Sequence, residues 1–400
     1  MKEPRLDTLF RARLNRRTLL TGASSALVTP LLGRRLQAAT TAAIRFAVIG
    51  DYGSNNLAAQ KVATLVRSWN PDFIITTGDN NYNLGGADTI DANIGQYYHD
   101  FIYQYRGSYG AGASLRRFFP CLGNHDWQTP NAQPYFDYFS LPFTYRYYDY
   151  VRGPVHFFVL DSDPQEPDGV TATSRQGQWL RSRLAAAQEP WKLVYFHHSP
   201  FSSGIEHGSN AWMQWPFQAW GAHAVLSGHD HDYERIVLNG FPYFVNGMGG
   251  ADYIDFTTPV AGSQVCYNNH HGAMLVAANA TGIQFQFFSH LGVQVDTYTL
   301  GVSPPQPPLT APTDLVATVL SSSTIQVAWK DRNTAETGFE IERAPETNPF
   351  SRVATVQAST TTHISRELRP QVKYSFRVRA FAGTTYSPYS AVATVQTPAQ

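Results

Sequence analysis

The stretch IRFAVIGDYG, residues 44–53, is a mostly apolar run that ends in a glycine and an aspartate. Residues 44–49 predict a buried β-strand, because the run is short and rich in β-branched and aromatic side chains. Gly50 permits a sharp turn, so a carboxylate follows the strand end directly. Alone, a Gly-Asp pair is weak evidence, since it is more often a turn or a helix cap. The pattern becomes informative because the chain repeats it.

Four later apolar runs also end in side chains with lone pairs. They are DFIITTGDNNY (72–82), RFFPCLGNHDW (117–127), WKLVYFHHSP (191–200) and AHAVLSGHDHDY (222–233). Two intervening segments, 56–69 and 175–188, show helical patterns. Strands that alternate with helices predict a layered α/β sandwich. We expect the strand ends to deliver their polar residues to one edge of the sheet, where sites form in such folds.

The residues that end these runs form one set of candidate metal ligands: Asp51, Asp79, Tyr82, Asn124, His197, His229 and His231. A lone histidine at a strand end is more often structural, but the full series indicates a metal site. Without a cysteine cluster, imidazole and carboxylate suit iron, zinc or manganese. The set exceeds the four ligands of one zinc, and predicts two metals about 3.5–4 Å apart that share a carboxylate. A tyrosinate favours ferric iron at one position.

The order of these motifs resembles the purple acid phosphatases of the calcineurin-like metallophosphoesterase superfamily, over about residues 44–300. The resemblance implies a four-layer αββα catalytic domain over 44–302. It implies hydrolysis of phosphomonoesters by attack of a metal-bound hydroxide. The implied ligands are Asp51, Tyr82 and His231 on Fe(III), Asn124, His197 and His229 on a divalent metal (Zn, Fe or Mn), and Asp79 as the bridge.

The same resemblance implies two catalytic histidines: His125 would face the substrate, and His207 would bind or protonate the ester. Asp126 stands where plant members often have glutamate. His198 follows a ligand histidine directly and has no assignment. A phosphodiesterase or nucleotidase with the same two metals is an alternative that the cleft loops decide. The natural substrate, the second metal, the pH optimum and the oligomeric state stay open.

A proline-rich linker at 303–311 separates the catalytic domain from residues 312–400. The tail has short alternating strands and no helical pattern, which indicates an all-β sandwich. It resembles an immunoglobulin-like fibronectin type III domain, whose corner matches Leu368, Pro370 and Tyr374. Tethering of the enzyme to a surface or polymer through this domain is possible. In an alternative of a different class, the protein is a surface-binding protein that acts through the tail.

Residues 1–43 have a basic start, an apolar stretch over 18–32 and small residues after it, as in a secretory signal. The pair Arg16–Arg17 resembles a bacterial twin-arginine signal, and the apolar stretch is too short for a membrane span. We therefore expect a bacterial protein that is periplasmic or extracellular; the cleavage site stays open. The first 35 residues hold eight of the 30 basic and two of the 30 acidic residues, so the remainder carries −6. That charge argues against binding to nucleic acid.

Two further stretches favour structural readings. The acidic segment DSDPQEPD, residues 161–168, predicts a solvated loop in preference to a calcium site. The segment AWMQWPFQAW, residues 211–220, predicts an amphipathic helix with its tryptophans in packing.

Overall fold

The computed structural model describes residues 43–142, 146–302, 308–333, 336–382 and 385–399. The expected signal segment, except for residue 43, and the first part of the linker, 303–307, lie outside these ranges. Among the described residues, none of the helices has the length and apolar character that a membrane crossing requires.

Two mixed sheets form the larger domain. The first has the strand order β13 (Gln294–Gly301), β12 (Gly282–Ser289), β11 (Gly272–Ala278), β1 (Ile44–Ile49), β2 (Phe73–Thr76) and β3 (Phe118–Pro120). The second has the order β10 (Ser263–Tyr267), β8 (Tyr233–Leu238), β9 (Phe241–Asn246), β7 (Ala224–Gly228), β6 (Trp191–His198), β5 (Val155–Val159) and β4 (Tyr148–Arg152). Strands β1, β2 and β3 run parallel in one sheet, and β5, β6, β7 and β9 run parallel in the other.

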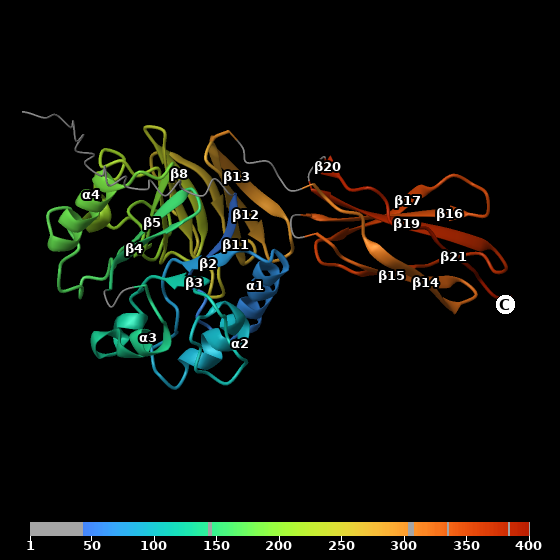
Figure 1. Ribbon diagram of the computed structural model, residues 1–400, viewed down its shortest axis with the longest axis horizontal. Coiled ribbons are helices and arrows are strands. Elements are labelled where there is room, and N and C mark those ends of the chain that lie inside the picture. The colour runs from blue at the N-terminus through green and yellow to red at the C-terminus, as the bar shows by residue number, and fades with distance from the viewer. Residues whose placement is uncertain (1–42, 143–145, 303–307, 334–335, 383–384, 400) are drawn as a thin grey trace, which may run out of the picture. The chain divides into compact units, whose positions relative to one another are not determined.

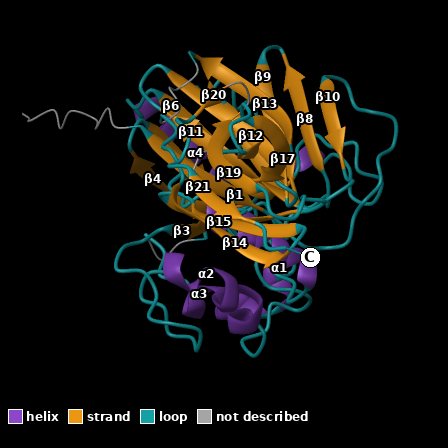
Figure 2. Ribbon diagram, turned by 90° about the vertical axis from the view of Figure 1, so that its right-hand side faces the viewer, coloured by secondary structure: helices purple, strands orange, loops and turns teal. Residues whose placement is uncertain are grey.

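The two sheets pack face to face, and helices cover their outer faces. Phe46 and Phe73 of the first sheet meet Phe157 of the second in a core of aromatic rings, with centroids 5.1 and 5.6 Å from Phe157. The helices α1 (Leu57–Ser68), α2 (Gln96–Tyr98) and α3 (Gln133–Tyr138) lie on one side, and α4 (Arg175–Ala186) lies on the other (Figure 1). Figure 2 shows the first three gathered below the strands. This arrangement is the expected αββα sandwich.

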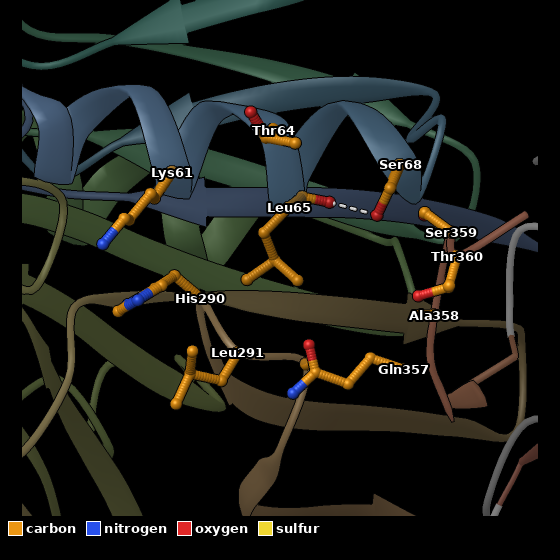
Figure 3. A pocket seen from close by; sticks show the side chains of 11 residues that line it. Lys61, Thr64, Leu65, Ser68, His290, Leu291, Gln357, Ala358, Ser359 and Thr360 are labelled. Atoms are coloured by element: carbon orange, nitrogen blue, oxygen red, sulfur yellow. Dashed lines mark hydrogen bonds between the residues drawn. The ribbon is translucent and has the colours of Figure 1, made fainter. Parts of the chain in front are cut away.

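Helix α1 shows how sequence signals fix the outer layer. Its N-cap, Asn56, accepts a hydrogen bond from the Ala59 backbone through Oδ1 at 2.8 Å, which satisfies a free amide of the first turn. Near its end, Ser68 Oγ donates to the Leu65 carbonyl at 2.6 Å, and the Leu65 side chain points toward Leu291 in the turn after β12 (Figure 3). The apolar face of α1 therefore lies against the first sheet.

Residues 211–220 do not form the predicted helix. Only the single 3-10 turn Ala211–Met213 is helical there. Pro216 has no N–H and restricts the backbone of Trp215, so a helix cannot continue through this point. The Trp215 Nε1 donates instead to the carbonyls of Trp212 and Val170, at 2.7 and 3.1 Å. Trp215 thus packs as expected, at 3% exposed, but on a loop, whereas Trp212 is 37% exposed.

In the described part of residues 308–399, every element is a strand. One sheet is β14 (Thr313–Ser321), β15 (Thr324–Lys330) and β18 (Thr362–Ser365); the other is β17 (Ser351–Gln357), β16 (Gly338–Pro345), β19 (Lys373–Ala382) and β20 (Thr385–Tyr386), with β21 (Ala393–Gln396) on β19. Tyr374 Oη accepts a hydrogen bond from the Arg369 amide at 3.0 Å, the corner that the sequence predicts.

Candidate metal centre

The predicted ligands come together where strand ends of both sheets converge. Asp51 follows β1, Asp79 and Tyr82 follow β2, and Asn124 follows β3; His197 is the second-to-last residue of β6, and His229 and His231 follow β7. The expectation of a single sheet edge was wrong, because β1, β2 and β3 belong to one sheet, and β6 and β7 to the other. The site lies between the two sheets, at the carboxyl ends of parallel strands from each.

The glycines of the motifs make room for the ligands. Gly78 has a φ of 95°, and a Cβ there would lie 2.7 Å from His197 Nδ1. A Cβ on Gly228 would lie 2.4 Å from Asp51 Oδ2. Neither distance is possible for a real side chain, so both positions require glycine while these ligands keep their places. Gly78 and Gly228 therefore each leave room for a candidate ligand that comes from another strand.

One group of lone pairs converges on His197, which is fully buried. Its Nδ1 lies 2.9 Å from the Thr77 carbonyl, which can only accept, so Nδ1 carries the proton. The other ring nitrogen, Nε2, lies 2.9 Å from Asn124 Oδ1, 3.1 Å from His229 Nδ1 and 3.4 Å from Asp79 Oδ2. One hydrogen on Nε2 cannot satisfy three acceptors, whereas a cation among these atoms would.

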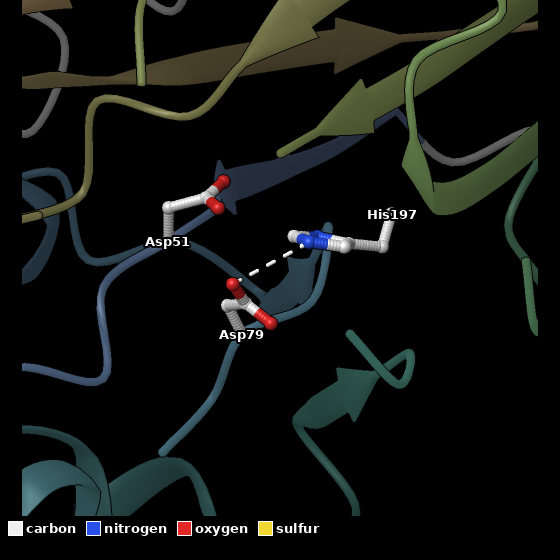
Figure 4. Close-up of side chains that lie close together, drawn as sticks. All are labelled: Asp51, Asp79 and His197. Carbon is white, nitrogen blue, oxygen red and sulfur yellow. Dashed lines mark ion pairs between the residues drawn. The ribbon is translucent and has the colours of Figure 1, made fainter. Parts of the chain in front are cut away.

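The electrostatics of His197 also fit a cation. Ligand atoms of Asp51, Asp79 and His197 all lie within 4.8 Å of one another, and all three residues are buried (Figure 4). Burial lowers the pKa of His197, but Asp79 and Asp51 outweigh it and raise the pKa to about 10. A proton on His197 supplies positive charge to the two carboxylates. A bound metal would supply the same charge.

A second group of lone pairs surrounds Tyr82. Its Oη lies 3.2 Å from His231 Nε2 and 3.3 Å from Asp51 Oδ1. His231 Nδ1 donates to the Asp252 carbonyl at 2.8 Å, so Nε2 is the nitrogen whose lone pair is directed at this group. The two rings of the His-x-His motif therefore lie in different groups: His229 is beside His197, and His231 is beside Tyr82.

The second group also fits a cation. Burial, together with Asp79 and Asp51, raises the pKa of Tyr82 well above its ordinary value. Burial likewise raises the pKa of Asp51. A phenol between two carboxylates cannot ionise without a strong positive charge nearby. Asp79 acts on both Tyr82 and His197, so it is common to the two groups.

The two predicted catalytic histidines stand beside these groups. His125 donates its backbone N–H to Asp79 Oδ1 at 2.9 Å, its Nδ1 contacts the Asn83 carbonyl at 2.6 Å, and its Nε2 lies 3.9 Å from Asp79 Oδ2. The His125 side chain is 30% exposed. His207 is exposed, and its ring stacks on His229 with the centroids 4.0 Å apart. Both rings can therefore meet a molecule that approaches from solvent.

The acidic stretch 161–168 is not the solvated loop that its composition predicts. Asp161 is 0% and Glu166 is 3% exposed. Trp127 Nε1 donates to Asp161 Oδ2 at 3.0 Å, and Arg146 Nε donates to Glu166 Oε2 at 2.6 Å. These partners lie far away in the sequence, so composition alone gives no sign of them.

Sequence reasoning also missed the groups that orient the ligands. Three of these are backbone carbonyls, those of Thr77, Asn83 and Asp252. No residue type marks a backbone contact, so the sequence carries no signal for it. Asp126 is different, since its carboxylate was visible in the motif but its burial was not; it is 2% exposed.

Comparison with known protein families identifies both domains. Residues 44–233 match the family model for calcineurin-like phosphoesterases, and residues 310–396 match the model for fibronectin type III domains. Human tartrate-resistant acid phosphatase type 5 is 27% identical over 271 residues, which cover 56% of this chain and 78% of that protein. Purple acid phosphatase 17 of Arabidopsis thaliana is 24% identical over 254 residues, which cover 54% of this chain and 71% of that protein.

Solved structures agree on the fold. Purple acid phosphatase PPD1 from yellow lupin seeds superimposes with a TM-score of 0.53 at 16% identity, over 65% of this chain and 54% of that one. GAP50, the anchor in the inner membrane complex of Plasmodium, superimposes with a TM-score of 0.52 at 20% identity, over 66% of this chain and 90% of that one. Because one neighbour is an enzyme and the other is described as an anchor, the fold alone does not decide the function.

Proposed function

We propose that this chain, which joins a calcineurin-like metallophosphoesterase domain to a fibronectin type III domain, hydrolyses phosphomonoesters as a two-metal acid phosphatase. The observation that carries the proposal is the convergence of buried lone pairs in two groups that share Asp79. The acid phosphatase homologues support the reaction class. They leave the natural substrate open.

The ligand assignment is part of the proposal. Asp51, Tyr82 and His231 would hold ferric iron, Asn124, His197 and His229 would hold a divalent metal (Zn, Fe or Mn), and Asp79 would bridge. When bound, such a pair supplies Lewis acidity and an activated water for in-line displacement at phosphorus. Two carboxylates and one phenolate offset three of the five positive charges. The remaining charge attracts a phosphate dianion.

His125 and His207 would act on the substrate directly. His125 Nδ1 contacts the Asn83 carbonyl, so Nε2, which lies 3.9 Å from Asp79 Oδ2, is the ring nitrogen that would contact a phosphoryl oxygen. His207 is exposed beside His229, where its ring can give a proton to the oxygen of the leaving alcohol. The Asp79 carboxylate accepts a hydrogen bond from the His125 backbone amide. A proposed metal ligand therefore holds a residue that would contact the substrate.

Metal titration of the metal-stripped chain tests this function. We expect two metal ions per chain and hydrolysis of an aryl phosphate only when both are present. Asp79→Asn removes one negative charge from the proposed bridging ligand, so this variant should bind only one metal ion per chain. Asp88→Asn, at a position that has no contact with the ligands, is the matched control. Full hydrolysis by metal-free protein, or a single metal at saturation, would rule out the two-metal mechanism.

Export is a separate part of the proposal. The pair Arg16–Arg17 supports a twin-arginine route and a periplasmic or extracellular enzyme, although residues 1–42 lie outside the described part of the chain. Replacing both arginines by lysine should stop export while the cytoplasmic protein keeps its phosphatase activity. Unchanged export of this variant would contradict the route.

A further inference from the structure

His198, which the sequence leaves without a role, reaches the metal centre because β6 contains a bulge. Tyr195 pairs with Leu226, but His198 pairs with Gly228, so β6 contains one more residue than β7 over this interval. In a regular strand, neighbouring side chains point to opposite faces. A bulge re-aims one of them. Here the rings of both His197 and His198 approach His229, with centroid distances of 4.8 and 4.4 Å.

The His198 ring is held from two other sides. The Ser162 hydroxyl accepts from the His198 backbone N–H at 2.9 Å and lies 2.9 Å from the ring Nδ1, to which it can donate. The Trp212 ring lies 5.7 Å away, and its Nε1 donates to the Ser162 carbonyl at 3.1 Å. Ser162 and Trp212 therefore bind each other and enclose His198. The ring is 5% exposed, so it has little freedom to turn.

His229 contacts two further histidine rings besides His197. The exposed His207 stacks on it, with the planes 23° apart, and the buried His198 packs against it, with the planes 49° apart. The backbone of His229 has a φ of 75°, and its N–H contacts the Asp51 carboxylate at 3.1 Å. The backbone is thus fixed by Asp51, but the direction of the ring depends on the rings around it.

We propose that His198 is a positioning residue, which holds the His229 ring so that its Nδ1 points at the group around His197. This inference rests on the proposed two-metal function. The contact acts at only one of the two metal positions, because among the described residues Tyr82 and His231, side chains of the other position, do not contact His198. Loss of the ring would leave space beside His229, and the ring could then rotate away from the divalent metal.

Release of zinc from the full-length chain, loaded first with ferric iron and then with zinc, tests the positioning role. A chelator reports zinc release, and visible absorption reports the iron–tyrosinate position. We expect His198→Ala to release zinc about 10–100-fold faster, the range for losing an outer contact of a metal ligand, with unchanged absorption. His198→Phe keeps a ring against His229 and should stay near the wild-type rate.

Two more variants separate positioning from general loosening. Ser162→Ala removes the hydroxyl that orients His198 while the ring stays, so we expect a smaller increase in zinc release. Ser162→Ala also tests the inference if His198→Ala does not fold. His223→Ala is the matched control, because His223 Nδ1 accepts from the Lys192 amide at 3.0 Å and its ring packs on Trp191, far from the ligands. We expect it to release zinc like the wild type.

Wild-type zinc release from His198→Ala would overturn the inference and leave the proposed function intact. Equal loss of zinc and of absorption in both His198→Ala and His198→Phe would show a general structural role and would also overturn it. A wild-type chain that binds no second metal would overturn both the inference and the two-metal function.

Discussion

Asp126 Oδ2 accepts hydrogen bonds from both the backbone and the side-chain amide of Asn80, at 3.2 and 2.8 Å. It also accepts from the Gly123 amide at 2.9 Å. Asn80 follows the proposed bridging ligand Asp79, and Gly123 precedes Asn124. One buried carboxylate therefore ties the loop after β2 to the loop after β3.

Asp126→Ala should lower the free energy of unfolding by about 3 kcal/mol or more, because it leaves three buried donors without an acceptor. Asp126→Asn keeps an oxygen and should cost less. Urea unfolding of the metal-free chain measures both. Asp137→Ala, at an exposed position, is the control. Equal unfolding midpoints for Asp126→Ala and Asp137→Ala would show that the carboxylate does not tie the two loops.

Tyr82→Phe tests which position takes ferric iron. Tyr82 Oη is the atom that lies between Asp51 and His231, and a phenolate on ferric iron absorbs visible light. The variant should lose this absorption and bind iron more weakly, while zinc stays at the other position. Absorption spectra and metal content measure the two effects. Colour that persists in Tyr82→Phe would remove tyrosine from the ligand set.

The convergence of the proposed ligands was predictable from sequence because each of these residues stands at the end of a short apolar run. That regularity comes from the fold, in which strands end at a common place. The sheet assignment was not accessible, because nothing in the β6 and β7 segments distinguishes a strand of the first sheet from one of the second. Packing between distant segments decides which strands pair. The sequence pattern predicts where each strand lies, but it does not predict which strand is its neighbour.

The outer contacts of the site were not predictable for a different physical reason. The carbonyls of Thr77 and Asp252 orient two ligand histidines through the backbone, which every residue type supplies. The role of His198 depends on a bulge in β6, and a one-residue shift in pairing leaves no mark in composition or periodicity. The predicted helix at 211–220 was wrong because the spacing of its apolar residues is helical but Pro216 prevents a helix from continuing through the segment.

His207→Ala tests the proton donor of the proposed mechanism. If the exposed His207 ring protonates the leaving oxygen, alkyl phosphates should lose more activity than aryl phosphates with acidic leaving groups. The expected loss for poor leaving groups is about 10²–10⁴-fold, the usual contribution of a general acid. Rates for a series of phosphomonoesters measure it. An equal loss across the series would assign His207 to binding alone.

Acid stability depends on a charged cluster away from the metal centre. His156 lies between two carboxylates, with Nε2 2.6 Å from Asp149 Oδ2 and Nδ1 2.8 Å from Glu189 Oε2, and Arg183 also binds Asp149. Burial raises the pKa of Asp149, but hydrogen bonds from His156 and Arg183 outweigh it, so the pKa falls below its ordinary value. The pKa of Glu189 is lowered in the same way, against burial, by His156.

Lowered carboxylate pKa values stabilise the folded chain above the unfolded-state value of about 4, and this stability is lost as pH falls through the folded-state value. Asp149→Asn should therefore cost about 3 kcal/mol near neutral pH and weaken the dependence of stability on pH on the acid side. Urea midpoints across that range measure it. Asp100→Asn, which breaks an exposed pair with Arg67, should cost less than about 1 kcal/mol. Parallel pH curves for the wild type and Asp149→Asn would contradict the prediction.

The most direct measurement compares hydrolysis of an aryl phosphate monoester with that of the bis-aryl diester of the same alcohol, by the metal-loaded chain, from acid to alkaline pH. Two metals with His125 and His207 beside them predict a strong preference for the monoester and an optimum on the acid side. A preference for the diester would keep the two-metal site but contradict the phosphomonoesterase. No turnover of either ester, with both metals bound, would contradict the enzymatic account.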